Sequence, residues 1–187
     1  MNHDENYHGL INLVDKRERV VRGFIHFLEE ETSWLTSPAS SRYHNAFEGG
    51  LLKHSISVAE TLIKIKGILA PSIDNESCVI VGLFHDVGKV GVPGKPYYLP
   101  NPQGSELGSK RKYIVNREVV PMGLAVRSLF LVSQHFPLTE EEAQAIAYHD
   151  GQYIEENRII AHKEEPLTLL LSYADNWAGS ILERKKD

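Results

Sequence analysis

Apolar residues recur at helical spacing along most of this chain, and this pattern constrains the fold more than any other feature. Between residues 16 and 31 they form one stripe, with charged residues left for the solvent side, made of Val20, Val21, Phe24, Ile25 and Leu28. A second stripe runs from about residue 51 to residue 69 and ends before Pro71. A third stripe precedes His85, can be capped by Asp74 or Asn75, and consists of Val79, Ile80, Leu83 and Phe84. The pattern predicts a bundle of helices.

The second half of the chain continues in the same way after one irregular segment. The segment from residue 93 to about residue 120 is rich in prolines, glycines and tyrosines and contains a short β-prone run, KYIVN. This composition predicts a small β-hairpin or an ordered loop. Helical spacing returns at residues 124–136, and Thr139 to Glu142 has the form of a capping box for a further helix. Pro166 suits the first position of the last helix. We therefore expect an all-α fold with a hairpin or loop insertion near residues 93–120.

Length and composition indicate an ordinary globular protein. The chain has 187 residues and no Pro/Gly/Ser-rich linker, so we expect a single domain over residues 1–187. No apolar stretch is long enough to span a bilayer, and the N-terminus lacks the features of a signal peptide. The single cysteine, Cys78, has apolar neighbours and is expected to be a packed thiol. These features favour a cytoplasmic protein with no membrane association, while an oligomer is compatible with them.

The charge of the chain bears on its partners. A formal net charge of −5 argues against a protein that coats nucleic acid through bulk electrostatics. Basic residues do gather locally, however, at Lys89, Lys95 and residues 110–112. These could draw an anionic substrate toward a site, or they could belong to a solvated loop.

Three His-Asp pairs occur among the nine histidines, and their contexts differ. His3-Asp4 lies in a polar opening segment without apolar periodicity, so we expect a frayed terminus there. His85-Asp86 ends the apolar run CVIVGLF, and Gly88 follows where a helix commonly stops in a left-handed cap. This pair is therefore predicted to be held at the end of a buried helix, where a charge needs a partner.

Two further residues interrupt apolar helical patterns, His54 in the second predicted helix and Asp175 in the last. An acid that follows LTLLLSYA is costly to bury without a cation or a hydrogen-bond donor. A histidine beside Lys53 is, by itself, more often a structural residue than a ligand. Helix bundles nevertheless build metal sites from His and Asp side chains that project inward from facing helices. His54, His85, Asp86 and Asp175 suit such a site.

These residues resemble the HD superfamily of metal-dependent phosphohydrolases, whose pattern is a histidine, a His-Asp pair and a distant aspartate on helices. The matching strings are RYHNAFEGGLLKHS, FHDVGK and SYADN. They look most like the HD domains of bacterial and phage-type proteins, including those of some 3′-to-5′ exoribonucleases. The resemblance covers about residues 40–180 and leaves the helix at residues 16–31 outside as a scaffold. It implies an HD-domain helical bundle.

The resemblance also implies a divalent metal ion bound by His54, His85, Asp86 and Asp175, with a water completing the coordination sphere. A cation can lower the pKa of bound water to roughly 7 and screens charge on a phosphoryl oxygen. Two imidazoles and two carboxylates do not distinguish Mn, Fe, Co, Ni, Zn and Mg. Asp86 could in addition orient the attacking water. Lys89 could stabilise transition-state charge, or simply favour the dipole at a helix end.

Other residues are candidates for substrate binding. By resemblance, Arg42 and His44 could bind phosphate, although a turn with ordinary polar residues explains them equally well. Tyr97 and Tyr98 could stack on a base or cover a core edge. His149 lies where some relatives hold a second metal ion. We expect it to contact substrate phosphate or a weakly bound second ion.

The evidence for a second metal ion is divided. Where relatives carry a further histidine, this chain has Leu124. His135 is nearby, but we expect it to be a surface or helix-terminus residue. We therefore predict one tightly held metal ion.

Together these features predict a metal-dependent hydrolase of phosphomonoesters or phosphodiesters, acting on a small phosphorylated substrate such as a nucleotide or on short single-stranded nucleic acid. One alternative is a non-catalytic HD domain that binds metal or nucleotide in a regulatory role. Another is a structural helical domain with chance histidines, which the ordered pattern disfavours. The fold by itself does not decide among these.

Overall fold

The computed structural model describes residues 3–102 and 111–184, which form a helical bundle with one small antiparallel sheet. The α-helices are α1 (His3–Ile11), α2 (Glu18–Glu31), α3 (Gly50–Leu69), α4 (Asn75–Phe84), α5 (Leu124–Ser133), α6 (Glu140–Tyr148) and α7 (Pro166–Trp177). Shorter helical turns are η1 (Val87–Val90), η2 (Gly151–Tyr153), η3 (Glu155–Ile160) and the π-helical η4 (Ala178–Leu182). The strands are β1 (Tyr98–Pro100) and β2 (Tyr113–Val115). The predicted all-α fold with a hairpin insertion is confirmed.

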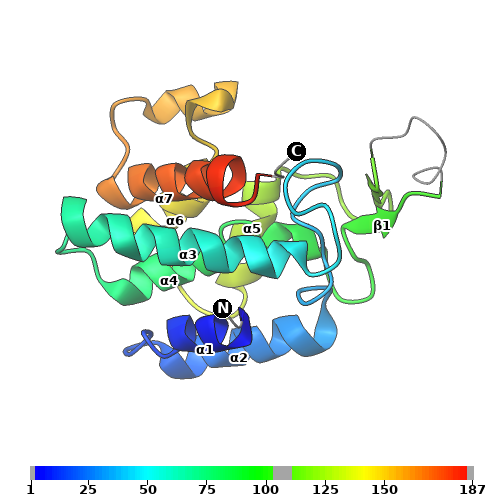
Figure 1. Cartoon of the computed structure of the whole chain (residues 1–187), viewed down its shortest axis with the longest axis horizontal. Helices are drawn as coiled ribbons and strands as arrows, with labels where there is room; N and C mark the ends of the chain where they lie inside the picture. The colour runs from blue at the N-terminus through cyan, green and yellow to red at the C-terminus, as the bar shows by residue number, and fades with distance from the viewer. Residues whose placement is uncertain (1–2, 103–110, 185–187) are drawn as a thin grey trace.

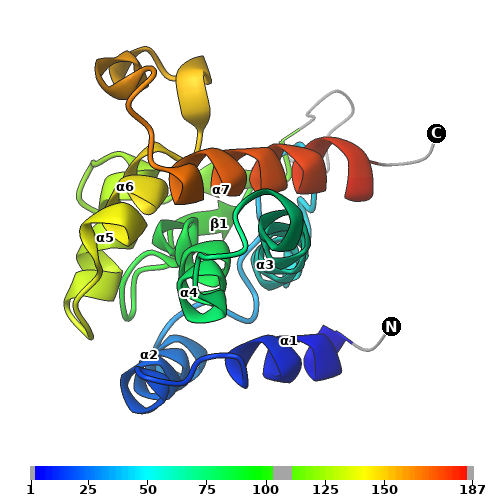
Figure 2. The same cartoon turned by 90° about the vertical axis from the view of Figure 1, so that its left-hand side faces the viewer.

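The helices are arranged in layers, with α3 and α4 in the middle (Figure 1). Helices α1 and α2 lie along one side of this pair, and α7 lies along the other (Figure 2). Two groups of buried apolar side chains fill the spaces between the layers, one toward α1 and α2 and one toward α6 and α7. Because α4 contributes to both groups, its run CVIVGLF is buried on all sides.

The N-terminal segment differs from the prediction of a frayed terminus. Helix α1 starts at His3 and buries Tyr7, Leu10 and Ile11 in the core. The indole Nε1 of Trp34 donates a hydrogen bond to the hydroxyl of Tyr7 at 3.0 Å. The prediction was wrong because the first turn of α1 is polar. The buried apolar residues, at positions 7, 10, 11 and 14, follow only after it.

Most helix boundaries follow the local signals. Helix α3 ends at Leu69, before Pro71, and α6 starts with the predicted capping box between Thr139 and Glu142. Helix α5 ends at Ser133 rather than at residue 136. Val20, expected in the apolar stripe of α2, is exposed.

The insertion is a short hairpin in which Tyr98 pairs with Val115 and Pro100 with Tyr113. The backbone N–H of Lys112 donates to the carbonyl of Ser41, which joins the hairpin to the loop before α3. Of the basic triplet at 110–112, Lys110 lies outside the described residues.

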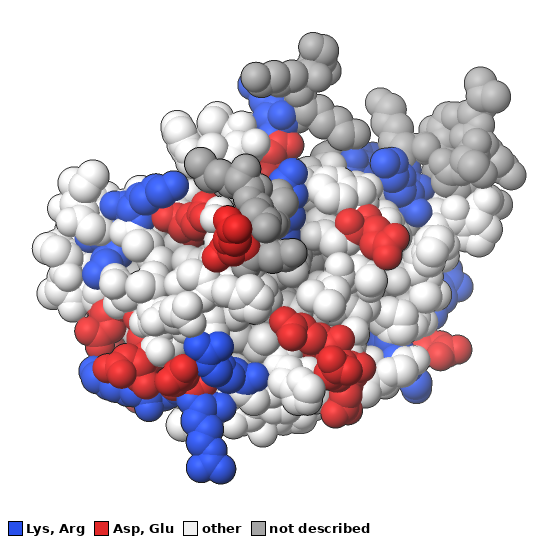
Figure 3. All heavy atoms as spheres, turned by 60° about the horizontal axis from the view of Figure 1, so that its bottom comes forward, with Lys and Arg blue, Asp and Glu red and all other residues white. Residues whose placement is uncertain are grey.

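The face over α1 and α2 carries acidic and basic side chains intermixed (Figure 3). This distribution agrees with the modest net charge of −5. None of the described helices combines the length and the apolar character needed to cross a membrane.

Candidate metal centre

Three helices meet at one end of the bundle and bring four predicted residues together. His54 lies in the second turn of α3, His85 caps the C-terminal end of α4, and Asp175 lies near the end of α7. The start of α3 and the end of α7 occupy the same end of the molecule (Figure 1). Asp86 follows His85 directly and precedes η1. Residues far apart in sequence therefore share one site.

The side chains of these four residues converge closely. The Nε2 atom of His54 lies 2.9 Å from Oδ1 of Asp175 and 3.9 Å from Oδ2 of Asp86. The Nε2 atom of His85 lies 3.5 Å from Oδ2 of Asp86 and 3.9 Å from Oδ1 of Asp175. Two imidazoles and two carboxylates thus face a common point, a donor set typical of several divalent metals.

The hydrogen bonds of the two histidines leave these Nε2 atoms unused. The Nδ1 atom of His85 lies 3.0 Å from the carbonyl oxygen of Gly82, and Nδ1 of His54 lies 3.1 Å from the carboxylate of Glu183. Both Nε2 atoms are buried without a hydrogen-bond partner among the described residues, and the 2.9 Å contact with Asp175 lacks hydrogen-bond geometry. Buried polar atoms normally have partners, so this arrangement fits a cation between the imidazoles and carboxylates.

Protonation of the site reflects its crowding with opposite charges. Burial by itself lowers the pKa of His54, but the carboxylates of Asp175 and Glu183 outweigh it and raise the pKa to about 9. Burial raises the pKa of Asp175 and Asp86, yet neighbouring cationic groups hold both below their usual range, His54 foremost for Asp175 and Lys89 foremost for Asp86. The site is therefore organised for ionised carboxylates.

Lys89, predicted as a catalytic residue, contacts the site directly. It lies in η1, and its Nζ donates to Oδ2 of Asp86. Burial lowers the pKa of Lys89, but the charge of Asp86 more than compensates and raises it. The ammonium group therefore stays charged beside the carboxylates.

His149 approaches from the other side, at the C-terminal end of α6. Its Nε2 atom lies 3.7 Å from Oδ1 of Asp86, and its ring centroid lies 4.8 Å from that of His85. Its Nδ1 atom is 2.8 Å from the carbonyl oxygen of Ile146. His85, His149 and Asp175 form a second group that could hold a metal ion. The structure thus brings His149 into the site beside the four residues above.

His44 and Arg42 lie on the open side of the site, in the loop before α3. The ring centroid of His44 is 4.9 Å from that of His54, and its buried Nε2 has no hydrogen-bond partner among the described residues. Burial lowers the pKa of His44, and the charges of His54 and Lys89 add to this effect. Arg42 is exposed and packs over the ring of Tyr43.

Glu183 is a site residue that sequence reasoning missed. Its side chain is only 2% exposed and contacts His54 through both carboxylate oxygens. The sequence signal is an acid eight residues after Asp175, and the π-helical turn η4 between them brings both onto one face. A carboxylate that holds the distal nitrogen of a ligating histidine fixes the ring and increases its basicity.

A glycine next to the pair has a different role from the one predicted. Gly88 does not adopt the left-handed conformation; Gly91, which ends η1, has a positive φ of 81°, but its ψ of −130° also lies outside the left-handed helical region. A Cβ atom at Gly88 would lie 2.5 Å from the carbonyl oxygen of Leu124. The expected helix cap was wrong because η1 continues the turn and packs its backbone closely against α5.

The remaining candidates lie elsewhere. His135 packs on the rings of Phe24 and Phe27, at 4.8 and 4.4 Å between centroids. Leu124 begins α5 and is half-buried. Tyr97 and Tyr98 contact each other at the hairpin, and the guanidinium of Arg127 lies over Tyr97.

Of three comparisons with known proteins, one gave a match. A comparison with curated proteins and another with solved structures gave no significant match. The model of the HD domain family matches residues 51–177, a range that contains His54, the His85-Asp86 pair and Asp175. HD domains bind divalent metals and constitute a superfamily of metal-dependent hydrolases. This chain belongs to the HD domain family.

Proposed function

We propose that the protein is a metal-dependent phosphohydrolase that cleaves a phosphomonoester or phosphodiester of a nucleotide or oligonucleotide. The observation that carries the proposal is the pair of buried Nε2 atoms, on His54 and His85, that face two carboxylates without hydrogen-bond partners among the described residues. His54, His85, Asp86 and Asp175 would hold the cation. A cation so held makes bound water acidic enough to attack at neutral pH and screens charge on a phosphoryl oxygen.

Each neighbouring residue then has a chemical task. Asp86 would orient the attacking water through Oδ1, the oxygen that faces His149, while its Oδ2 faces His85 and Lys89. The ammonium of Lys89 offsets negative charge that develops on the phosphoryl group. His149, His44 and Arg42 bind phosphate oxygens. A hollow of about 400 Å³, lined in part by His44, His149 and Asp175, gives a substrate access to these atoms.

A regulatory HD domain that binds metal or nucleotide without hydrolysis is the second candidate. It is favoured by Leu124, which stands where some relatives carry a further metal-binding histidine. The presence of His149 next to Asp86 favours the enzyme instead.

The test combines metal analysis with an activity panel. The purified protein is analysed for bound metal and assayed with nucleotides and a generic phosphodiester in the presence of Mn, Co, Ni or Mg. Hydrolysis with bound metal supports the enzyme, and metal binding without hydrolysis supports the regulatory domain. Failure to bind metal after reconstitution would exclude the enzyme.

Variants locate the activity. Asp86→Ala and Asp175→Ala should each abolish turnover and lower metal content, while circular dichroism shows a folded helical protein. The matched control is Asp74→Ala, which replaces an exposed acid at the opposite end of α4 and should leave metal content unchanged. Activity that survives Asp86→Ala would show that the chemistry lies elsewhere.

A further inference from the structure

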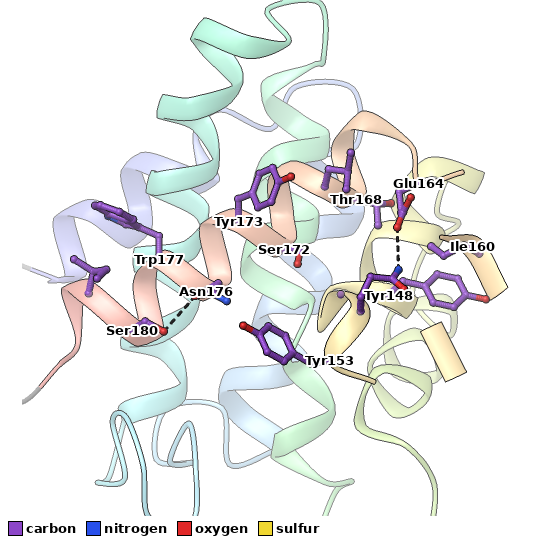
Figure 4. A pocket seen from close by; sticks show the side chains of 14 residues that line it. Tyr148, Tyr153, Ile160, Glu164, Thr168, Ser172, Tyr173, Asn176, Trp177 and Ser180 are labelled. Carbon is purple, nitrogen blue, oxygen red and sulfur yellow. Dashed lines mark hydrogen bonds between the residues drawn. The ribbon is translucent and has the colours of Figure 1, made fainter. Parts of the chain in front are cut away.

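A second hollow, larger than the one at the metal centre, lies between α7 and the segment that carries η2 and η3. Its volume is about 600 Å³, within the range of small-molecule sites. We call it the aromatic hollow, after the rings among its lining residues, which include Tyr148, Tyr153, Tyr173 and Trp177 (Figure 4).

The walls of the aromatic hollow are apolar and nearly uncharged. Tyr153 is 87% exposed, Tyr173 59% and Trp177 54%, so exposed rings cluster around this one hollow, as they do at binding surfaces. Of the lining residues, only Glu164 carries a charge, and its carboxylate accepts a hydrogen bond from Nε2 of Gln152 at 2.9 Å. Such walls suit a flat, neutral ring rather than a phosphate.

Polar side chains stand along one edge of this hollow. Figure 4 shows Ser172, Asn176 and Ser180 on α7 and η4, with the ring of Tyr153 across from them. The hydroxyl of Ser180 donates to Oδ1 of Asn176 at 3.3 Å. A side-chain amide next to exposed rings can bond the edge of a heterocycle while the rings stack on its face.

The aromatic hollow adjoins the hollow beside the metal centre. It shares Tyr153, Ser172, Asn176 and Ser180 with the hollow that is lined by His149 and Asp175. The latter hollow shares Tyr43, His44 and Gly179 with a third, which is lined by Arg42 and Arg184. A groove thus runs along α7 and η4 from aromatic rings, past the metal centre, to two arginines.

We propose that the aromatic hollow binds the base of a nucleotide whose phosphate reaches the metal centre. This assignment rests on the proposed phosphohydrolase function and adds the site at which the base of its substrate binds. A nucleotide carries its ring and its phosphate at opposite ends of a sugar, which is the order of chemistry along the groove. The arginines lie beyond the metal centre and suit a further phosphate.

Binding can be tested without turnover, because the two tryptophans differ in exposure. Trp34 is fully buried and hydrogen-bonded to Tyr7, whereas Trp177 lines the hollow. Adenosine, guanosine, cytidine and uridine have no phosphate to cleave. Each is added to the protein in increasing concentration while the tryptophan fluorescence is measured. At least one should quench it, and Trp177→Phe should remove that response. No quenching by any of them would contradict the proposal.

Kinetics supply the second arm. Tyr173→Ala should raise KM about tenfold for the best nucleoside monophosphate, because a stacked base contributes roughly that much. Tyr173 lines the aromatic hollow but not the hollow at the metal centre. KM for ribose 5-phosphate, which lacks a base, should not change. The control Ile159→Ala replaces an exposed residue of η3 that does not line the hollow and should affect neither substrate.

The two arms separate the possible failures. If nucleotides are hydrolysed but Tyr173→Ala changes KM equally for both substrates, the base site is wrong and the phosphohydrolase stands. If nucleosides quench Trp177 and no phosphate ester is cleaved, the base site stands and the hydrolase is wrong.

Discussion

His54 shows how one side chain can be fixed from both sides of its ring. Its Nε2 faces the carboxylates of the candidate metal centre, and its Nδ1 lies 3.1 Å from both oxygens of Glu183. Since a neutral imidazole carries one N–H, a proton on Nδ1 that is donated to Glu183 leaves a lone pair on Nε2 for a metal ion. Glu183 therefore favours the tautomer of neutral His54 that can bind metal, and a bound cation would take the place of the proton that the raised pKa otherwise keeps on Nε2.

Replacement of Glu183 by glutamine should weaken metal binding about 10- to 100-fold, as is usual when an outer partner of a ligating histidine is changed. The affinity is measured by competition with a metal-sensitive dye, so that turnover is not needed. Glu155→Gln, an exposed acid outside the site, is the control. Unchanged affinity in Glu183→Gln would mean that the carboxylate is not needed to orient His54.

The backbones of helices α3 and α4 approach each other closely at Gly82, three residues before His85. A Cβ atom at Gly82 would lie 2.6 Å from Cα of Ala59 and 2.8 Å from its Cβ. The carbonyl oxygen of Gly82 lies within hydrogen-bond distance of Nδ1 of His85. The fit of the two helices and the orientation of the histidine therefore depend on the same residue.

Gly82→Ala should lower the free energy of unfolding by about 1–3 kcal/mol, because a methyl group cannot be added at this contact without moving a helix. Gly67→Ala is the matched control, since Gly67 is exposed in α3 and a Cβ there meets no atom within 4 Å. This control should raise the stability by roughly 0.5–1 kcal/mol through helix propensity. Urea unfolding followed by circular dichroism measures both, and a neutral Gly82→Ala would show that the helices separate easily.

The whole bundle is tied together by a charge network far from the metal centre. Arg17, just before α2, donates to Glu76 in the first turn of α4 and to Glu142 in the first turn of α6. The side chain of Glu142 is fully buried and that of Glu76 is 10% exposed. One guanidinium thus joins the start of α2 to both α4 and α6.

Arg17→Met should lower the free energy of unfolding by about 3 kcal/mol at neutral pH, because it leaves a buried carboxylate unpaired. The adjacent Lys16→Ala removes an exposed ion pair with Asp74 and should cost less than about 0.5 kcal/mol. Equal losses in both variants would show that burial of the network contributes nothing.

The network also predicts how stability depends on pH. Burial alone would raise the pKa of Glu76 and Glu142, but hydrogen bonds from Arg17 outweigh it and lower both from their ordinary value of 4.5. The folded state then binds fewer protons than the unfolded state below that value, so this stabilisation is complete above pH 4.5 and is lost as the pH falls further. The difference between wild type and Arg17→Met should therefore shrink in acid. A constant difference down to pH 3 would contradict this account.

Much of this molecule was determined by local sequence. The apolar spacing of α2, α3 and α7, the capping box at Thr139 and the β-prone run of the hairpin act over a few residues, and each predicted its element. The ordered pattern of His54, His85-Asp86 and Asp175 also pointed to one site, because each interrupts or ends an apolar helix. Local signals misjudged α1, whose helix depends on burial of Tyr7 against Trp34, far along the chain.

Other features depended on how the helices pack. Glu183 meets His54 only because α7 and η4 run antiparallel to α3, and Gly88 is required only because η1 touches α5. The groove from the aromatic hollow to the metal centre exists only where η2 and η3 stand beside α7. Spacing along a chain fixes which face of a helix is apolar. Distances between side chains on different helices are fixed by how the helices pack, and a local sequence pattern does not encode that packing.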